Sequence, residues 1–250
     1  MTALPAAPDP RLPDLRNFRD VGGLRTIDGG AVRHGVIYRS ATPTFLNASQ
    51  ALVLSDELGL RTRIDLRSSV EIAESPAETL AHVYAEHLPL RAGGPWRANP
   101  DVTDPSEAVA AHYGRYLEHS MDSIAAIVRL VTNPERGALL LHCSAGKDRT
   151  GVSLAVMLSA VGVAHEEIVA DYARTRDDLE ALLDQLRLLP AYKQRLAALP
   201  AESLTAEPRS MEIFLDGLET AYGGARGYLA QAGVDDVLVE RLRSTLVERT

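Results

Sequence analysis

Residues 138–162 read ALLLHCSAGKDRTGVSLAVMLSAVG, and this stretch decides the fold. Its first five residues are apolar up to a final histidine, so they predict a short buried strand. A polar loop with Cys143, Gly146 and Arg149 follows, and an apolar helix begins near Thr150. Because free N–H groups and the positive end of the helix dipole meet in such a loop, the pattern predicts an anion-binding site.

The spacing of Cys143 and Arg149 indicates covalent chemistry on a phosphate group. The pKa of a thiol falls at a helix N-terminus beside cationic groups, and the thiolate is the nucleophilic form. Arg149 follows six positions later, where its planar guanidinium can hold two phosphate oxygens. Cys143 would then lie below the phosphorus atom, where attack gives a cysteinyl-phosphate and the loop amides stabilise the developing charge.

The ten residues from His142 to Gly151 resemble the His-Cys-x5-Arg-Thr/Ser-Gly phosphate loop of the cysteine-dependent protein-tyrosine phosphatases. Their Gly-Lys-Asp-Arg-Thr interior is most similar to an atypical bacterial branch with dual or triple specificity, whose members also act on phosphoinositides. Other landmarks of that branch resemble residues 17–23 (NFRDVGG), 38–40 (YRS) and 64–67 (IDLR). The resemblance implies an α/β fold in one domain, residues 1–250, with a central, mainly parallel twisted sheet flanked by helices.

The resemblance also implies roles for the loop residues. Cys143 is the nucleophile, Arg149 holds the phosphate, and Thr150 offers its hydroxyl to the Cys143 sulfur. His142 is expected to order the loop by hydrogen bonding. Lys147, one of only two lysines in the chain, adds a flexible charge that suits substrates with more than one phosphate. The residues expected to bind substrate are Ser144, Ala145, Gly146, Lys147 and Thr150.

Cleavage of a phosphate ester by a thiolate needs a general acid for the leaving oxygen and then a base for water. The usual tyrosine phosphatases carry this aspartate on a separate mobile loop, and Asp101 and Asp104 have a comparable position here. The atypical branch has an aspartate inside the phosphate loop. We therefore expect Asp148 as the first choice, Asp65 as the second and Asp104 as the third. A carboxylate that only holds the loop by hydrogen bonds is the alternative for Asp148.

Three further residues are candidates for support of the site. In the resembled family the stretch around Arg19 and Asp20 packs close to the active site, and a structural turn with a surface ion pair is an equal alternative. Arg67 follows the strand predicted at residues 61–66. Because ligands bind outside the carboxyl ends of strands in open α/β sheets, Arg67 and the preceding carboxylate are expected near the loop if the two strands are neighbours. Glu71 is the expected salt-bridge partner of Arg67.

The rest of the chain alternates strand and helix signals and then becomes helical. Strands are predicted at residues 36–40 and 84–90, and helices at residues 49–58 after a serine cap, 107–132, 165–175, 177–199, 211–221 and 234–247. Pro190 interrupts the leucine stripe of residues 177–199. Core packing is one interpretation of that stripe, and the resemblance supplies another, in which part of residues 177–208 forms a helical lid. Residues 1–13 are expected to be mobile, and the Gly- and Pro-rich loop at residues 92–105 is either a lid or a connection.

Composition excludes several classes of protein. A chain of 250 residues, 46% of them hydrophobic, can bury one substantial core. The formal charge of −8 disfavours nucleic acid as a partner. A single cysteine allows no internal disulfide and no multi-cysteine metal site. No apolar run is long enough for membrane insertion, and the start lacks a secretory signal, so a cytoplasmic location is expected, with export without a cleaved signal left open.

These observations predict a phosphatase for phosphotyrosine that needs no metal and no cofactor. Phosphoserine, phosphothreonine and phosphoinositides are further candidate substrates, so the partner is a phosphorylated protein or a phosphoinositide. A binding module that recognises phosphate with little catalysis is the alternative from another class. Sulfur transfer through a persulfide on Cys143 is a third interpretation, to which Arg149 and Asp148 bring no evident benefit. The oligomeric state has no signal in the sequence.

Overall fold

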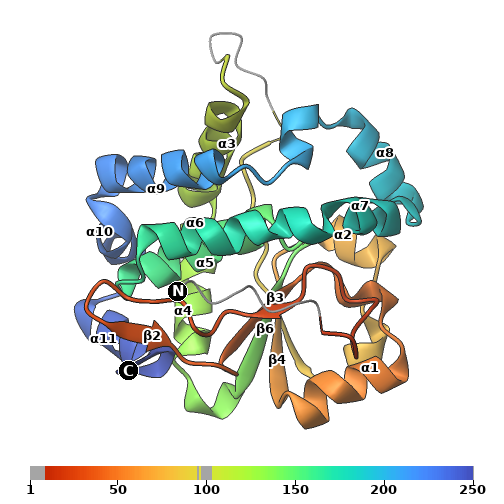
Figure 1. Cartoon of the computed structure of the whole chain (residues 1–250), viewed down its shortest axis with the longest axis horizontal. Coiled ribbons are helices and arrows are strands. Elements are labelled where there is room, and N and C mark those ends of the chain that lie inside the picture. The colour runs from red at the N-terminus through yellow and green to blue at the C-terminus, as the bar shows by residue number, and fades with distance from the viewer. Residues whose placement is uncertain (1–8, 95, 97–102, 250) are drawn as a thin grey trace.

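The structure is a computed structural model that describes residues 9–94, 96 and 103–249. Within these residues a five-stranded sheet forms the centre of the molecule (Figure 1). In spatial order its strands are β1 (Arg19–Asp20), β3 (Ile37–Ser40), β6 (Ala138–His142), β4 (Leu60–Asp65) and β5 (Tyr84–His87). Only the β1–β3 pair is antiparallel among these neighbours. The predicted mixed α/β fold with a mainly parallel sheet is confirmed.

The central strand β6 is buried on both faces, because successive side chains of a strand point to opposite sides. Leu139 and Leu141 join the larger core, to which helices from the second half of the chain contribute. Leu140 joins a smaller core on the other face, where the N-terminal segment packs through Leu12 and Leu15. The first eight of the residues expected to be mobile lie outside the described part of the chain.

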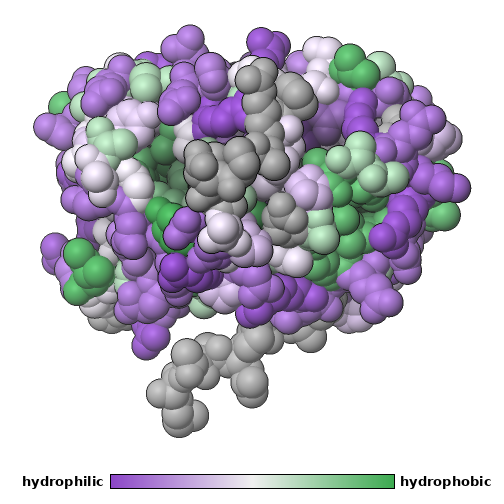
Figure 2. Space-filling model, turned by 90° about the horizontal axis from the view of Figure 1, so that it is seen from above, coloured by the Kyte–Doolittle hydropathy of each residue, from purple (hydrophilic) through white to green (hydrophobic). Residues whose placement is uncertain are grey.

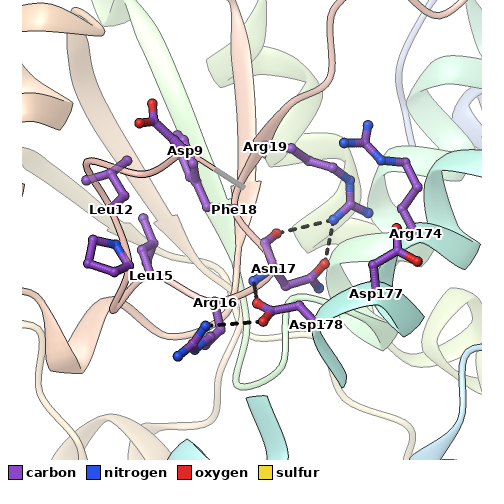
Figure 3. Close-up of a pocket in the computed structure, with 11 residues that line it drawn as sticks. Asp9, Leu12, Leu15, Arg16, Asn17, Phe18, Arg19, Arg174, Asp177 and Asp178 are labelled. Atoms are coloured by element: carbon purple, nitrogen blue, oxygen red, sulfur yellow. Dashed lines mark hydrogen bonds and ion pairs between the residues drawn. The ribbon is translucent and has the colours of Figure 1, made fainter. Parts of the chain in front are cut away.

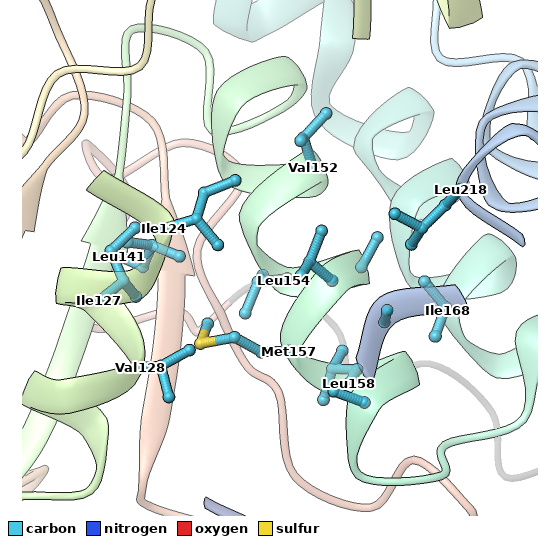
Figure 4. Packing of buried hydrophobic residues seen from close by; sticks show 14 of the residues in the cluster. Ile124, Ile127, Val128, Leu141, Val152, Leu154, Met157, Leu158, Ile168 and Leu218 are labelled. Carbon is cyan, nitrogen blue, oxygen red and sulfur yellow. The ribbon is translucent and has the colours of Figure 1, made fainter. Parts of the chain in front are cut away.

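Helix α5 (Asp148–Ala160) is apolar almost all round, and it lies in the middle of the larger core (Figure 4). On one side it meets Leu141 of β6 together with α4 (Met121–Val131), and on the other it meets α6 (His165–Ala173) and α9 (Pro208–Tyr222). Burial from all sides fixes the direction in which the N-terminus of α5 points. The phosphate loop lies at that end.

The other helices surround this arrangement. Their bounds are α1 (Ala48–Leu52), α2 (Ser69–Glu74), α3 (Pro105–His119), α7 (Leu179–Arg187), α8 (Pro190–Ala198), α10 (Gly224–Gln231) and α11 (Asp236–Leu246). A short antiparallel pair, β2 (Gly30–Val32) with β7 (Val247–Arg249), brings the last strand beside the N-terminal part of the chain (Figure 1). No helix in the described ranges is both long and apolar enough to cross a membrane.

Two helix predictions were wrong in detail. The helix expected at residues 107–132 is divided into α3 and α4 at Ser120, whose hydroxyl accepts from the Arg91 N–H at 2.7 Å and donates to the Arg91 carbonyl at 3.1 Å. The helix expected at residues 49–58 begins after an Asn47 cap, because Asn47 and Gln50 complete a capping box, and it ends in a π-helical turn, Val53–Glu57. Helices α2 and α10 were not predicted.

Candidate functional site

The phosphate loop lies at the carboxyl ends of three adjacent parallel strands. His142, the last residue of β6, is in register with Ser40 of β3 on one side and with Asp65 of β4 on the other. Cys143 follows, and α5 begins at Asp148. The strand that ends in Asp65 is a neighbour of β6, which meets the condition on which Asp65 and Arg67 were expected near the loop. Helix dipole, free amides and strand ends therefore meet at one point, which suits an anion.

Three carbonyl groups of the loop are held on its outer side by donors from other segments. Ser144 O accepts from the Thr42 N–H at 3.0 Å, Ala145 O from Asn17 Nδ2 at 2.9 Å, and Gly146 O from Arg39 Nη2 at 2.6 Å. Because the C=O and N–H of a trans peptide point in opposite directions, the N–H groups of residues 145–147 point away from these donors. The loop thus presents successive amide donors to its inner side, as an oxyanion cradle requires.

Gly146 allows the loop to approach β3. Its φ is +66°, and an added Cβ would collide with the backbone of Ser40. Residues with a side chain rarely adopt this conformation. Only glycine therefore fits at the turn of the cradle.

A buried ionic cluster supports the outer side of the loop. Asp171 of α6 accepts from Arg19 Nε at 2.6 Å and from Arg39 Nη1, and Arg19 Nη1 donates to Asn17 Oδ1 at 2.5 Å. Burial alone would raise the pKa of Asp171, but the two guanidinium groups outweigh burial and hold that pKa below its usual range. Burial, with the neighbouring charge of Arg39, lowers the pKa of Arg19 to about 10. These residues orient the two side chains that hold the loop carbonyls.

Asn17 connects this cluster to the segment before α7. Figure 3 shows it beside a small cavity of about 70 Å³, where its N–H donates to Asp178 Oδ2 at 2.7 Å and Arg16 donates to Asp178 Oδ1 at 3.3 Å. The predicted candidate Arg19 thus reaches the loop through Asn17. Asp20 is directed elsewhere, because its carboxylate accepts from the N–H groups of Gly22 and Gly35 and caps a turn.

Arg149 is held by Glu71 of α2 in a bidentate pair, with Nη1–Oε2 and Nη2–Oε1 distances of 2.8 Å each. The Ser144 hydroxyl donates to the same carboxylate at 2.6 Å. Burial alone would raise the pKa of Glu71, but Arg149 offsets burial and holds it well below the usual range. The expected Glu71–Arg67 pair was therefore wrong. Arg67 precedes α2, so helical spacing does not bring it to Glu71.

Arg67 pairs instead with Asp65, with Nη2–Oδ2 at 2.7 Å and Nε–Oδ1 at 2.9 Å. Burial opposes ionisation of Asp65, but the His142 ring and the Arg67 guanidinium hold its pKa below the ordinary value. Burial lowers the pKa of His142 to about 4, and His142 Nε2 lies 3.5 Å from Asp65. Asp65 is thus an ionised member of a salt bridge, which makes it a poor proton donor.

Lys147 and Thr150 differ from expectation. Lys147 is buried, and its Nζ donates to the carbonyls of Ser203 and Thr205 at 2.5 and 2.6 Å, so its position is fixed by the backbone. The Thr150 hydroxyl is buried without a hydrogen-bond partner in the described part of the chain. Helix α5 begins two residues before the predicted start, so Thr150 lies inside its first turn. The expected bond to the Cys143 sulfur is not formed among the described residues.

Asp148 is the carboxylate nearest the pocket among the candidate acids that the structure describes. Its Oδ1 accepts from the Tyr113 hydroxyl at 2.7 Å and lies 3.2 Å from Lys147 Nζ. Asp104 instead caps α3 and pairs with Arg209 at 2.9 Å. Asp101 lies outside the described residues. A carboxylate at the start of α5 beside the thiol can exchange a proton with a group bound between them.

A covered cavity of about 180 Å³ lies over Cys143, Asp148 and Arg149. Its outer wall is made by α7, α8 and the 3₁₀ turn η6 (Ala201–Leu204), whose leucines line it: Leu179, Leu183, Leu186, Leu196, Leu199 and Leu204. Figure 2 shows hydrophobic side chains gathered on the side of α7 and α8. Cys143 is only 1% exposed and also belongs to the larger buried core.

Comparison with known proteins identifies the family of the chain. The model of the tyrosine phosphatase family matches residues 10–248. The chain belongs to the tyrosine phosphatase family. It is therefore an enzyme of that family, as predicted from its sequence. Among curated relatives of the family, it is 29% identical over 281 residues to the triple specificity protein phosphatase PtpB of Mycobacterium tuberculosis, covering 94% of this chain and 98% of that protein.

A putative tyrosine-protein phosphatase of Cupriavidus necator is 28% identical over 240 residues, which cover 89% of this chain and 83% of that protein. Solved structures with similarity include the core catalytic domain of the PP-IP phosphatase Siw14 from S. cerevisiae, with a TM-score of 0.37, 19% identity, and coverage of 64% and 76% of the two chains. Another is P. aeruginosa TpbA, with a TM-score of 0.34, 22% identity, and coverage of 70% and 87%.

Sequence reasoning missed several residues at the site. Glu71 had a local signal, because Ser68 and Glu71 form a capping box, but that signal predicts only the start of α2. Tyr113 and Tyr172 had no signal beyond their place on the apolar faces of two helices. Asp171 had none either, since its partners lie more than a hundred positions away.

Proposed function

We propose that this chain hydrolyses phosphotyrosine through a cysteinyl-phosphate on Cys143. The observation that carries the proposal is the convergence of one thiol, inward-facing loop amides and Arg149 on a single pocket. This combination binds a tetrahedral oxyanion and holds its phosphorus against a nucleophile. No step of the reaction calls for a metal ion.

In the first step the Cys143 thiolate attacks phosphorus, the bond to the leaving oxygen breaks, and Asp148 gives that oxygen its proton. In the second step Asp148 takes a proton from water, the hydroxide attacks phosphorus, and the sulfur leaves as thiolate with release of phosphate. Arg149 and the loop amides hold the equatorial oxygens in both steps. Glu71 binds the Nη1–Nη2 end of the guanidinium, and we propose that the Nε side of Arg149 faces the phosphate.

The proposal includes a lid formed by residues 177–208. Cys143 is almost completely buried, and residues of α7 and α8 line the cavity above it, so we propose that this cover moves when a substrate enters. The leucines on the inner face of the cover offer an apolar wall to the ring of an aryl phosphate. Phosphoserine, phosphothreonine and phosphoinositides are proposed as further substrates. The relative named as a triple specificity phosphatase supports this wider range.

The test is a substrate panel of an aryl phosphate, phosphopeptides and phosphoinositide vesicles, with a metal chelator present. The wild type is expected to release phosphate from the aryl phosphate and the phosphotyrosine peptide, and Cys143→Ser is expected to release none. Phosphate that stays bound to the wild-type protein after acid quenching would identify the cysteinyl-phosphate. Turnover by Cys143→Ser would refute the mechanism, and tight phosphopeptide binding without release by the wild type would favour a binding module.

A further inference from the structure

Two buried tyrosines from different helices form a hydrogen-bonded chain that ends on Asp148. The Tyr113 hydroxyl, from α3, donates to Asp148 Oδ1 at 2.7 Å. The Tyr172 hydroxyl, from α6, lies 2.8 Å from the Tyr113 hydroxyl. Both rings are buried, and they meet edge to face with centroids 6.1 Å apart. These two hydrogen bonds link α3 and α6 to Asp148, the first residue of α5.

The bond from Tyr113 to Asp148 decides which hydroxyl donates in the bond between the two tyrosines. A tyrosine hydroxyl has one proton to donate. Since Tyr113 gives its proton to Asp148, the bond between the two hydroxyl groups uses the proton of Tyr172. Burial and the negative charge of Asp148 raise the pKa of Tyr113 well above its usual range, and burial also raises that of Tyr172. Both hydroxyl groups therefore stay protonated as donors throughout an assay range near neutral pH.

The two oxygens of Asp148 have different surroundings. Oδ1 accepts from Tyr113 and also lies 3.2 Å from Lys147 Nζ. Oδ2 has no hydrogen-bond partner in the described part of the chain, and the side chain keeps 32% of its exposure at the pocket. Because Tyr113 and Lys147 both lie at Oδ1, a proton on the Asp148 carboxyl group would be carried by Oδ2.

We propose that Tyr113, ordered by Tyr172, is a positioning residue that directs Oδ2 of Asp148 toward the leaving oxygen. This proposal rests on the role of Asp148 as general acid in the proposed function. When Asp148 loses its proton, the Tyr113 hydroxyl stabilises the carboxylate that forms. A charge-assisted hydrogen bond of this kind strengthens as charge develops, so it assists proton transfer to poor leaving groups most.

Other titratable groups also face Asp148, and they stay in place when Tyr113 is changed. They come from the loop and α5 on one side and from two helices on the other: Cys143, Lys147 and Arg149; His112 and Tyr116 of α3; and Tyr172 of α6. Lys147 is held in place by two backbone carbonyls.

The test is the Tyr113→Phe variant, measured as kcat/KM against pH for aryl phosphates with good and poor leaving groups. Without the donor, the carboxylate that forms when Asp148 gives up its proton lacks a charge-assisted hydrogen bond. We expect the alkaline limb of the profile to move to higher pH, and kcat/KM to fall about 10- to 100-fold for poor leaving groups. For good leaving groups the fall is expected to be about threefold or less. Tyr172→Phe removes only the bond between the two tyrosines. It should shift the alkaline limb and lower kcat/KM for poor leaving groups in the same direction, but by less.

Tyr228→Phe is the matched control. It also removes a buried tyrosine hydroxyl bonded to α3, where Tyr228 donates to Leu117 O at 3.0 Å, but it lies outside the pocket. It should leave the limb and the leaving-group dependence unchanged. Adding Tyr113→Phe to Asp148→Asn should have no further effect on either readout.

Equal losses for all leaving groups with an unmoved alkaline limb in Tyr113→Phe would overturn the proposal. If Tyr113→Phe fails to fold, an unmoved limb in Tyr172→Phe would overturn it in the same way. The general-acid assignment fails separately, when Asp148→Asn itself shows no dependence on the leaving group. In that case the positioning role falls with the acid, while attack by Cys143 is still supported by its own test.

Discussion

Replacing Glu71 by glutamine removes the charge that orients Arg149 but keeps the size of the side chain. The helix cap survives, because glutamine also serves at the third position of a capping box. Arg149 loses one of two bonds of 2.8 Å, since the amide NH₂ of glutamine faces a guanidinium N–H. A hydrogen bond between charged groups contributes about 1.5–3 kcal/mol, which corresponds to a fall of about 10- to 150-fold in kcat/KM.

The assay is kcat/KM on an aryl phosphate, with the inhibition constant of inorganic phosphate measured beside it. Glu71→Gln should weaken inhibition by phosphate, because a misoriented guanidinium binds the oxyanion less well. Glu57→Gln is the matched control. It alters an exposed Glu–Arg pair, with Arg11 at 2.6 Å, and neither residue lines the cavity over Cys143. Tighter inhibition by phosphate in Glu71→Gln would refute the reasoning, because it would mean that Glu71 competes with substrate for Arg149.

Three further predictions follow from the geometry. Gly146→Ala should abolish turnover and phosphate binding, because its φ of +66° and the nearby Ser40 backbone exclude a Cβ; phosphate protection against thermal unfolding would report the loss. Arg149→Lys should lower kcat/KM by about a hundredfold or more, since a point charge replaces a planar fork, and equal phosphate affinity in the two proteins would contradict this. Asp171→Asn should destabilise the fold by about 3–5 kcal/mol at pH 7, because two guanidinium groups lose their buried partner. The pKa of Asp171 is depressed in the folded state, so its contribution is complete above about pH 4 and is lost as pH falls through the folded value; denaturation curves against pH should show the gap between variant and wild type closing below that point.

The loop, the buried helix after it and the neighbouring strand could be predicted because each has a local signal. The strand β6 and the apolar helix α5 are continuous in the sequence, and the loop residues carry a spacing that only a few kinds of site use. The position of Asp148 at the cavity was also predictable in part, because Asp148 is adjacent to Arg149 in the sequence.

The partners of the loop could not be predicted, because they come from distant segments. Glu71 and Arg149 are 78 positions apart, and the local rule that linked Glu71 to Arg67 assumes a helix that begins only at Ser69. Tyr113 and Tyr172 look like core residues until packing shows that their hydroxyl groups are hydrogen-bonded to each other and, through Tyr113, to Asp148. The break at Ser120 has the same cause, since its hydroxyl satisfies the backbone of a loop residue, Arg91.

Asn17 makes hydrogen bonds both to the loop after β6 and to the start of α7. Its side-chain amide keeps the Ala145 carbonyl turned outward, while its backbone N–H binds Asp178 at the base of α7. A displacement of Asp178 would therefore also move Asn17, whose side chain fixes the peptide between Ala145 and Gly146. A substitution that shifts the start of α7 is therefore expected to shift the Ala145 carbonyl and the N–H of Gly146 as well.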